Sequence, residues 1–76
     1  MSNYYGVQMI EVSSSNVASV GYDETAQILY VRFINGTLYI YKGVPIMEFH
    51  GLLNASSVGS YLHRNIKNAY LYERIE

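Results

Sequence analysis

Two β-rich runs separated by Asn35-Gly36 constrain the fold of this chain more than any other feature. They occupy residues 28–42, ILYVRFINGTLYIYK. Asn-Gly between such runs favours a two-residue type I′ hairpin turn, because both central residues of that turn need a positive φ. A two-residue turn here pairs Phe33 with Leu38 and fixes the register of the hairpin. Because side chains alternate along a strand, this register sorts the hairpin residues onto two faces.

The two predicted faces differ in chemistry. One is purely apolar, needs a covering layer, and consists of Leu29, Val31, Phe33, Leu38 and Ile40. The other is aromatic with one cation, is expected to stay open, and consists of Tyr30, Arg32, Ile34, Thr37, Tyr39 and Tyr41.

The residues before the hairpin predict further strands. Residues 1–8 are expected to be a loose arm, and residues 9–12 a short strand. Residues 17–23, VASVGYD, are typical of a longer strand. Gly21 inside it indicates a bulge or a close approach of another backbone or a ligand. Asp23 is placed to accept a hydrogen bond in the turn that leads into the hairpin.

The residues after the hairpin predict two short helices and a closing strand. Pro45 is favourable at a helix start, so the first helix is expected over residues 45–54. Either Ser56 or Ser57 is a good N-cap for the second. Residues 70–75, YLYERI, alternate and indicate a final extended segment. We therefore expect an α+β fold in which a three- to four-stranded antiparallel meander has both helices on one face.

Length and charge limit the classes of function. The 76 residues make one small domain, and no cysteine is available for a disulfide or a thiolate metal site. A core of this size gains from oligomerisation. No apolar run approaches 18 residues and the N-terminus does not resemble a signal peptide, so we expect a cytoplasmic protein without membrane contact. Five Lys and Arg against six Asp and Glu argue against strong binding to a nucleic-acid backbone, whereas nine tyrosines favour interfaces and ligand pockets.

An ordered set of short motifs resembles the KTSC domain family. The set spans about residues 10–75 and consists of VGYD at 20–23, YIY at 39–41, GVP at 43–45, ASSVG at 55–59 and YLYER at 70–74. That family takes its name from a domain at the C-terminus of some lysyl-tRNA synthetases and includes free-standing bacterial and phage proteins. The resemblance implies a possible role in RNA binding and provides no active site to transfer.

The start of the second helix is a candidate anion site. Backbone N–H groups at a helix start favour a phosphate, and glycine allows close approach. Together with the hairpin tyrosines and nearby cations, the predicted ligand-binding set is Ser56, Ser57, Gly59, Arg64, Lys67, Tyr39, Tyr41 and Arg32.

The tyrosines also suit a protein interface, because Tyr and Arg are enriched there. The closing segment is able to add a strand to the sheet of its own chain or of a neighbouring subunit. The predicted interface set is Tyr30, Tyr39, Tyr41, Tyr70, Tyr72 and Arg74.

Catalysis and metal binding have little support in the sequence. His50 and His63 lack metal-ligand spacing, and Asp23 is the single aspartate available to a hydrolytic triad. We therefore expect no catalytic residue, no metal and no cofactor. The favoured function is a non-catalytic homo-oligomer that binds or sequesters a phosphate-bearing ligand, such as a nucleotide or cyclic nucleotide signal. An RNA-binding module and a protein–protein adaptor are the alternatives.

Overall fold

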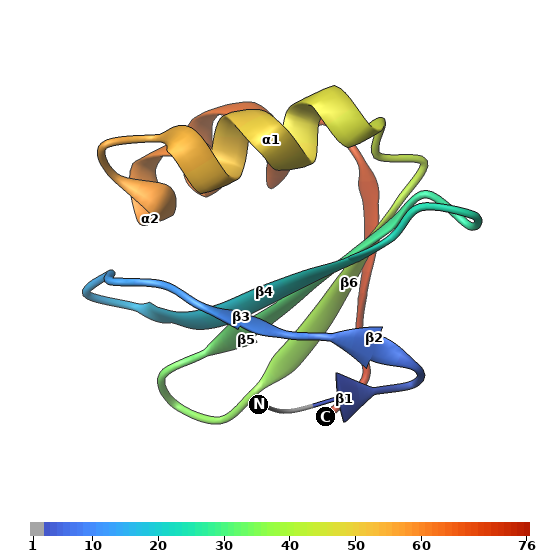
Figure 1. Ribbon diagram of the computed structural model, residues 1–76. Coiled ribbons are helices and arrows are strands. Elements are labelled where there is room, and N and C mark those ends of the chain that lie inside the picture. The colour runs from blue at the N-terminus through green and yellow to red at the C-terminus, as the bar shows by residue number, and fades with distance from the viewer. Residues whose placement is uncertain (1–2) are drawn as a thin grey trace.

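The computed structural model describes residues 3–76 as one antiparallel sheet with helices on one face and an N-terminal hairpin on the other (Figure 1). The sheet has the strand order β3-β4-β5-β6-β7, and every neighbouring pair is antiparallel. Its strands are β3 (Ile10–Glu11), β4 (Val17–Asp23), β5 (Ile28–Phe33), β6 (Leu38–Lys42) and β7 (Leu71–Arg74). The expected α+β class is confirmed, with one strand more than the upper expectation.

The helical layer follows β6 and returns the chain to β7. Its elements are α1 (Ile46–Asn54), α2 (Val58–Tyr61) and a π-helical turn, η1 (Leu62–Ile66). Pro45 is the N-cap of α1, so the helix begins one residue after the predicted start. The N-cap of α2 is Ser57, whose hydroxyl accepts the N–H of Ser60 at 3.3 Å. Both expected helix starts are therefore close to those observed.

A polar contact joins the two parts of the helical layer. The Glu48 carboxylate on α1 accepts the Tyr61 hydroxyl at 2.6 Å and the Tyr70 hydroxyl at 2.8 Å. A Cβ at Gly51 would lie 2.2 Å from the Tyr61 hydroxyl oxygen, so glycine makes room for the ring on α1. These hydrogen bonds hold the end of α2 and the start of β7 against α1.

The predicted hairpin register is wrong by one residue. Tyr30 pairs with Ile40, and Arg32 pairs with Leu38. The loop has three residues, closed by hydrogen bonds from the Gly36 N–H to the Phe33 carbonyl and from the Phe33 N–H to the Thr37 carbonyl, both at 2.9 Å. Gly36 takes the positive φ of 95°, as in a type I turn followed by a glycine bulge.

The Asn35 side chain explains why the longer loop forms. Its Oδ1 accepts the backbone N–H of Thr37 at 3.1 Å and the Thr37 hydroxyl at 2.8 Å. These two bonds hold Asn35 at a negative φ. Gly36 is therefore the residue of this loop that takes the left-handed region.

This one-residue difference in register places the side chains of β6 on the faces opposite to those predicted. Tyr39 and Tyr41 lie on the face covered by the helices, together with Leu29, Val31 and Phe33. Leu38 and Ile40 lie with Tyr30 on the other face. The predicted open surface that combined Tyr30, Arg32, Tyr39 and Tyr41 is therefore wrong.

The second face is covered by the N-terminal residues, which form the hairpin of β1 (Asn3–Tyr4) and β2 (Val7–Gln8) rather than a loose arm. Val7 and Met9 are buried against Tyr30 and Leu38. Gly21 allows this approach, because a Cβ there would lie 2.7 Å from the Met9 sulfur and 3.0 Å from the Gln8 carbonyl oxygen. The expected close approach at Gly21 is confirmed, and it comes from the chain's own N-terminal backbone.

Within residues 3–76, no helix combines the length and hydrophobicity needed to cross a membrane.

Candidate functional site

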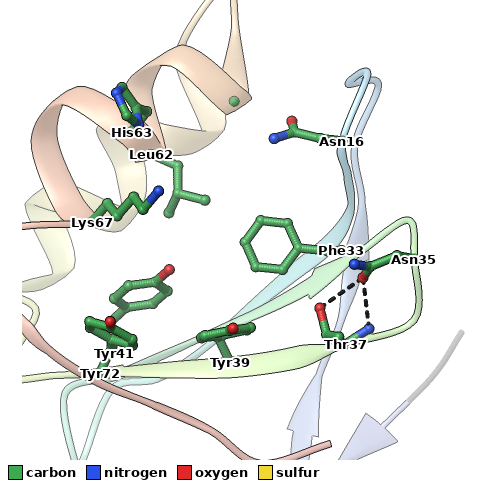
Figure 2. Close-up of a pocket in the computed structure, with 11 residues that line it drawn as sticks. Asn16, Phe33, Asn35, Thr37, Tyr39, Tyr41, Leu62, His63, Lys67 and Tyr72 are labelled. Carbon is green, nitrogen blue, oxygen red and sulfur yellow. Dashed lines mark hydrogen bonds between the residues drawn. The ribbon is translucent and has the colours of Figure 1, made fainter.

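A pocket of about 310 Å³ lies between the helical layer and the hairpin (Figure 2). One wall is the helix-facing side of β5, β6 and β7, and the opposite wall is α2 with η1. The residues that line it are Asn16, Phe33, Asn35, Thr37, Tyr39, Tyr41, Gly59, Leu62, His63, Lys67 and Tyr72.

The sheet wall of the pocket is aromatic. The ring centroids of Tyr39 and Tyr72 are 6.0 Å apart, as are those of Tyr41 and Tyr72. Phe33 meets Tyr39 edge to face at 5.5 Å. Burial raises the pKa of the Tyr41 phenol, so its hydroxyl is neutral and available for hydrogen bonding at pH 7. Such a surface provides ring faces for stacking and hydroxyl groups at its rim.

The helix wall contributes a cation. Lys67 follows the π-helical turn, and its N–H bonds to the Leu62 carbonyl at 2.8 Å. Figure 2 shows its side chain extending across the pocket from the helix. No carboxylate is among the lining residues, and Lys67 has no ion-pair partner in the part of the chain that the structure describes. An uncompensated ammonium beside tyrosine rings favours an anion.

The loop before β4 closes one end of the pocket against the helix. Asn16 lies so near the start of α2 that a Cβ at Gly59 would be 2.7 Å from its Oδ1. The Asn16 carbonyl also accepts the N–H of Ile34 at 2.9 Å, which ties this loop to the hairpin loop. A larger residue at position 59 would therefore displace the Asn16 side chain from the start of the helix.

Four of the eight predicted ligand-binding residues line this pocket. They are Tyr39, Tyr41, Gly59 and Lys67. They come together although the predicted register was wrong, because the observed register turns both tyrosines toward the helices.

The other four residues of that set lie outside the pocket lining. Ser57 caps α2 through its hydroxyl, and Ser56 and Arg64 are exposed. Arg32 is on the opposite face of the sheet. There its Nη2 lies 2.8 Å from a Glu76 carboxylate oxygen and its Nη1 donates to the Gly36 carbonyl at 2.7 Å.

The predicted interface residues are dispersed. Tyr30 is buried and stacks with Tyr5 at 6.0 Å, and the Tyr70 hydroxyl is bonded to Glu48. Arg74 is exposed on β7. Tyr72 is 59% exposed and also contacts Tyr39 and Tyr41, so it belongs both to the pocket and to the edge of the sheet.

Sequence reasoning missed part of the pocket. The lining residues that it did not assign to a ligand site are Asn16, Phe33, Asn35, Thr37, Leu62, His63 and Tyr72, the last of which was predicted as an interface residue. Asn35 was predicted to form the hairpin turn, and a turn signal does not reveal which surface the side chain faces. Among residues 3–76, no group of three His, Cys, Asp or Glu side chains is arranged to hold a metal ion.

Comparison with known proteins identifies the family. The model of the KTSC domain matches residues 13–70. An uncharacterized protein from Stutzerimonas stutzeri is 38% identical over 71 residues, which cover 92% of this chain and all of that protein. The crystal structure of a KTSC domain protein from Yersinia pestis superposes with a TM-score of 0.87 at 34% identity, covering 92% of this chain and 99% of that one.

Part of a larger enzyme is also similar. A lysine–tRNA ligase from Nostoc is 33% identical over 67 residues, which are 88% of this chain and 12% of the ligase. The expected resemblance is confirmed by the family match, the shared fold and these relatives. The chain belongs to the KTSC domain family.

Proposed function

We propose that this protein is a non-catalytic binder of a small phosphate-bearing ligand with an aromatic ring, such as a nucleotide. The observation that supports this most strongly is Lys67, which has no ion-pair partner within residues 3–76 and lies in a pocket lined by three tyrosines and no carboxylate. In this arrangement the ring of the ligand stacks on the tyrosines and its phosphate meets the ammonium group. Base stacking on an aromatic side chain contributes about 1–3 kcal/mol.

Size and charge support a small ligand over a polymer. A volume of about 310 Å³ is at the lower end of ordinary ligand pockets. One lysine suffices for one phosphate, whereas binding to a nucleic-acid backbone needs several clustered cations. The chain has five Lys and Arg against six Asp and Glu, so few cations are available for a polyanion.

A thermal-shift experiment tests the proposal with a panel of nucleoside monophosphates and cyclic nucleotides. A ligand at a hundred times its Kd adds about 2.7 kcal/mol to the free energy of unfolding, which raises Tm by roughly 10–20 °C in a domain of this size. Lys67→Gln is expected to weaken that ligand about tenfold or more, because a charge-assisted hydrogen bond is lost.

Arg64→Gln is the matched control. It removes the same charge from the same helical segment, but Arg64 is outside the pocket lining. The proposal predicts that this variant keeps nearly the wild-type affinity. If both variants weakened binding equally, the affinity would depend on the overall positive charge of this helical segment rather than on Lys67 in the pocket. The absence of a Tm shift with every nucleotide would contradict the proposal.

RNA binding is the second candidate, because the similar segment in Nostoc belongs to a lysine–tRNA ligase. Unpaired bases stack on aromatic side chains, and the pocket offers several. Binding of a single-stranded RNA should then weaken steeply between low and moderate salt. A salt-independent affinity would exclude recognition through the RNA backbone.

We also propose that the protein self-associates through β7. This edge strand is exposed along its whole length, and Leu71 is 79% exposed. The Ile75 N–H donates to the Leu38 carbonyl of β6 at 2.8 Å, so by alternation the N–H and C=O groups of Tyr72 and Arg74 point away from the sheet. An unpaired edge of this kind is a template for another strand.

A second copy is the occupant that this strand fits. Antiparallel self-pairing about Glu73 sets the two Glu73 side chains opposite each other, and Lys42, which lies 3.4 Å from Glu73 in its own chain, offsets their repulsion. In this register Tyr72 of each copy faces Arg74 of the other, and Leu71 faces Ile75. Both pairs are favourable, the first as a cation–π contact and the second as an apolar contact. The second copy would also extend the sheet beside the pocket, because Tyr72 belongs to β7 and also lines the pocket.

Analytical ultracentrifugation tests the pairing. Leu71→Glu is expected to shift the population toward monomer, because it places a carboxylate in the paired edge. Met47→Glu is the matched control, since Met47 is 73% exposed on α1 and is not part of the paired strand. A wild-type protein that is monomeric at high micromolar concentration would rule out this interface.

A further inference from the structure

Self-pairing of β7 would place a side chain of the second copy on the pocket side of the sheet. In the register of β6 and β7, Tyr72 is opposite Tyr41 and Arg74 is opposite Tyr39. The three tyrosines all line the pocket. Because opposite residues in an antiparallel pair project to the same face, Arg74 lies on this face too, beside Tyr39. The edge strand therefore presents one cation to the side of the sheet on which the pocket lies.

The pairing about Glu73 determines where the arginine of the second copy lies. Arg74 of the partner subunit is directly opposite Tyr72, and the Cβ atoms of such a pair are about 4.5–5.5 Å apart. Its side chain projects to the same face as Tyr72, which is the face of the pocket. A dimer of this kind has two-fold symmetry, so each pocket receives one arginine from the other copy.

The partner's Arg74 would approach the part of the pocket that contains Lys67. Figure 2 shows Lys67 extending from the helix at the end of the pocket where Tyr41 and Tyr72 lie, and the hairpin loop is at the other end. Tyr72 belongs to the edge strand, so the end with Lys67 is the one nearest the second copy. A phosphate beside Lys67 would therefore lie within reach of a long arginine side chain that starts next to Tyr72.

Arg74 has donors available for a ligand. In its own chain its Nε donates to the Glu76 backbone carbonyl at 3.0 Å. Arg74 is exposed and has no ion-pair partner within residues 3–76. A guanidinium group has five N–H donors in a planar fork that suits two oxygens of one phosphate. Most of these donors are therefore available to an anion in the neighbouring pocket.

The same pairing brings like charges together. The two Arg74 side chains are diagonal neighbours on one face of the extended sheet, about 7–8 Å apart. Both Glu73 side chains project to the opposite face, and no carboxylate lines the pocket, so this repulsion is not offset within the pocket. A phosphate bound by Lys67 and the partner's Arg74 supplies the missing negative charge. The dimer is therefore expected to be more stable with an anion in its pockets than without one.

We infer that the phosphate site is shared between two copies of the chain, with Lys67 contributed by one copy and Arg74 by the other. This inference rests on the proposed nucleotide site and on the proposed pairing through β7. It adds a regulation to them, because nucleotide binding and dimerisation then strengthen each other by the same factor. Arg74 is thereby assigned as a ligand-binding residue of the neighbouring pocket rather than of its own.

Mixing two variants tests the shared site. The probes are the 5′-monophosphates of adenosine, guanosine, cytidine and uridine, and isothermal titration measures their Kd. Lys67→Gln and Arg74→Gln should each weaken binding about fivefold or more, because each removes a charge-assisted hydrogen bond. In an equal mixture of these two variants, about half of the dimers contain one chain of each. One pocket of such a dimer has both cations, so about a quarter of all pockets should regain the wild-type affinity.

Leu71→Glu is the control for the route of this recovery. By alternation its side chain projects away from the face of the pocket, and its charge disrupts the pairing of β7. Added to both variants, it should abolish the recovery on mixing. On its own it should weaken nucleotide binding about fivefold, because the partner's Arg74 is lost. Met47→Glu adds the same charge outside β7 and should leave the wild-type Kd nearly unchanged.

The outcomes separate this inference from the proposed function. No recovery on mixing, or an affinity that Leu71→Glu leaves unchanged, would overturn the shared site and leave a nucleotide pocket within a single chain. Recovery that persists with Leu71→Glu in both variants would overturn the pairing through β7 and this inference with it. Failure of the wild-type protein to bind any of the four nucleotides would contradict the proposed function as well.

Discussion

At the scale of single residues, Glu48 joins the parts of the helical layer through two hydrogen bonds. It lies in the first turn of α1 and receives hydroxyl groups from two tyrosines that come later in the chain. The three side chains come from α1, α2 and the residue before β7. One carboxylate therefore couples segments whose order in the sequence gives no sign that they meet.

Tyr61→Phe is expected to lower the free energy of unfolding by about 1.5–3 kcal/mol, because it removes a 2.6 Å hydrogen bond to a partly buried carboxylate. Urea unfolding measures the change. Tyr5→Phe is the comparison, since it removes an exposed hydroxyl whose contact with Glu76 is long, at 3.5 Å. A similar, small loss in both variants would mean that the Glu48 contact contributes little.

At the scale of elements, the tyrosines that anchor the helical layer make its stability depend on pH. The hydrogen bond to Glu48, followed by burial, raises the pKa of Tyr61, and burial followed by the same carboxylate raises that of Tyr70. A raised pKa means that the folded state holds these protons more tightly than the unfolded chain does. The resulting stabilisation is complete below about pH 10 and is lost as the pH rises through the raised values.

Urea midpoints from pH 8 to pH 11 test this dependence. The wild-type protein should lose stability as the pH rises above about 10. In the double variant Tyr61→Phe/Tyr70→Phe, the urea midpoint should fall less steeply with pH than in the wild type. It should still fall, because burial also raises the pKa of Tyr22, Tyr30 and Tyr41. A slope equal to that of the wild type would contradict the proposed coupling.

The hairpin shows how much of an element can be predicted from sequence. Both strands, their antiparallel pairing and the location of the loop around Asn35-Gly36 were predicted correctly, but the two-residue turn type was wrong. The register was wrong because the Asn35 side chain bonds to Thr37 and favours a three-residue loop over the two-residue type I′ turn. One residue of difference reversed the faces of β6, so Tyr39 and Tyr41 became walls of a pocket instead of parts of an open surface.

At the scale of the whole molecule, one sheet separates two cores. The larger lies under the helices, and the smaller consists of Val7, Met9, Tyr30 and Leu38 under the N-terminal hairpin. Figure 1 shows the helical layer and this hairpin on opposite sides of the sheet. The pocket belongs to the helix side, so the two faces have separate roles.

Deletion of residues 1–8 is expected to destabilise the protein by on the order of 2 kcal/mol or more, because it removes the buried Val7 and exposes Tyr30. It should leave the affinity of the pocket for its ligand nearly unchanged. Urea unfolding and the thermal-shift titration provide the two readings. Unchanged stability would show that the N-terminal hairpin is not part of the core, and a large loss of affinity in a folded variant would contradict the separation of the faces.

The sequence by itself determined the local elements and the family. Alternation of apolar residues, Pro45, the serine cap and the glycine positions are local signals, since each acts on the few residues beside it. The tertiary structure decided which side chains meet. Register, the covering of the second face and the approach of Asn16 to Gly59 depend on contacts between residues far apart in the chain, and the pocket exists only where those contacts bring its walls together.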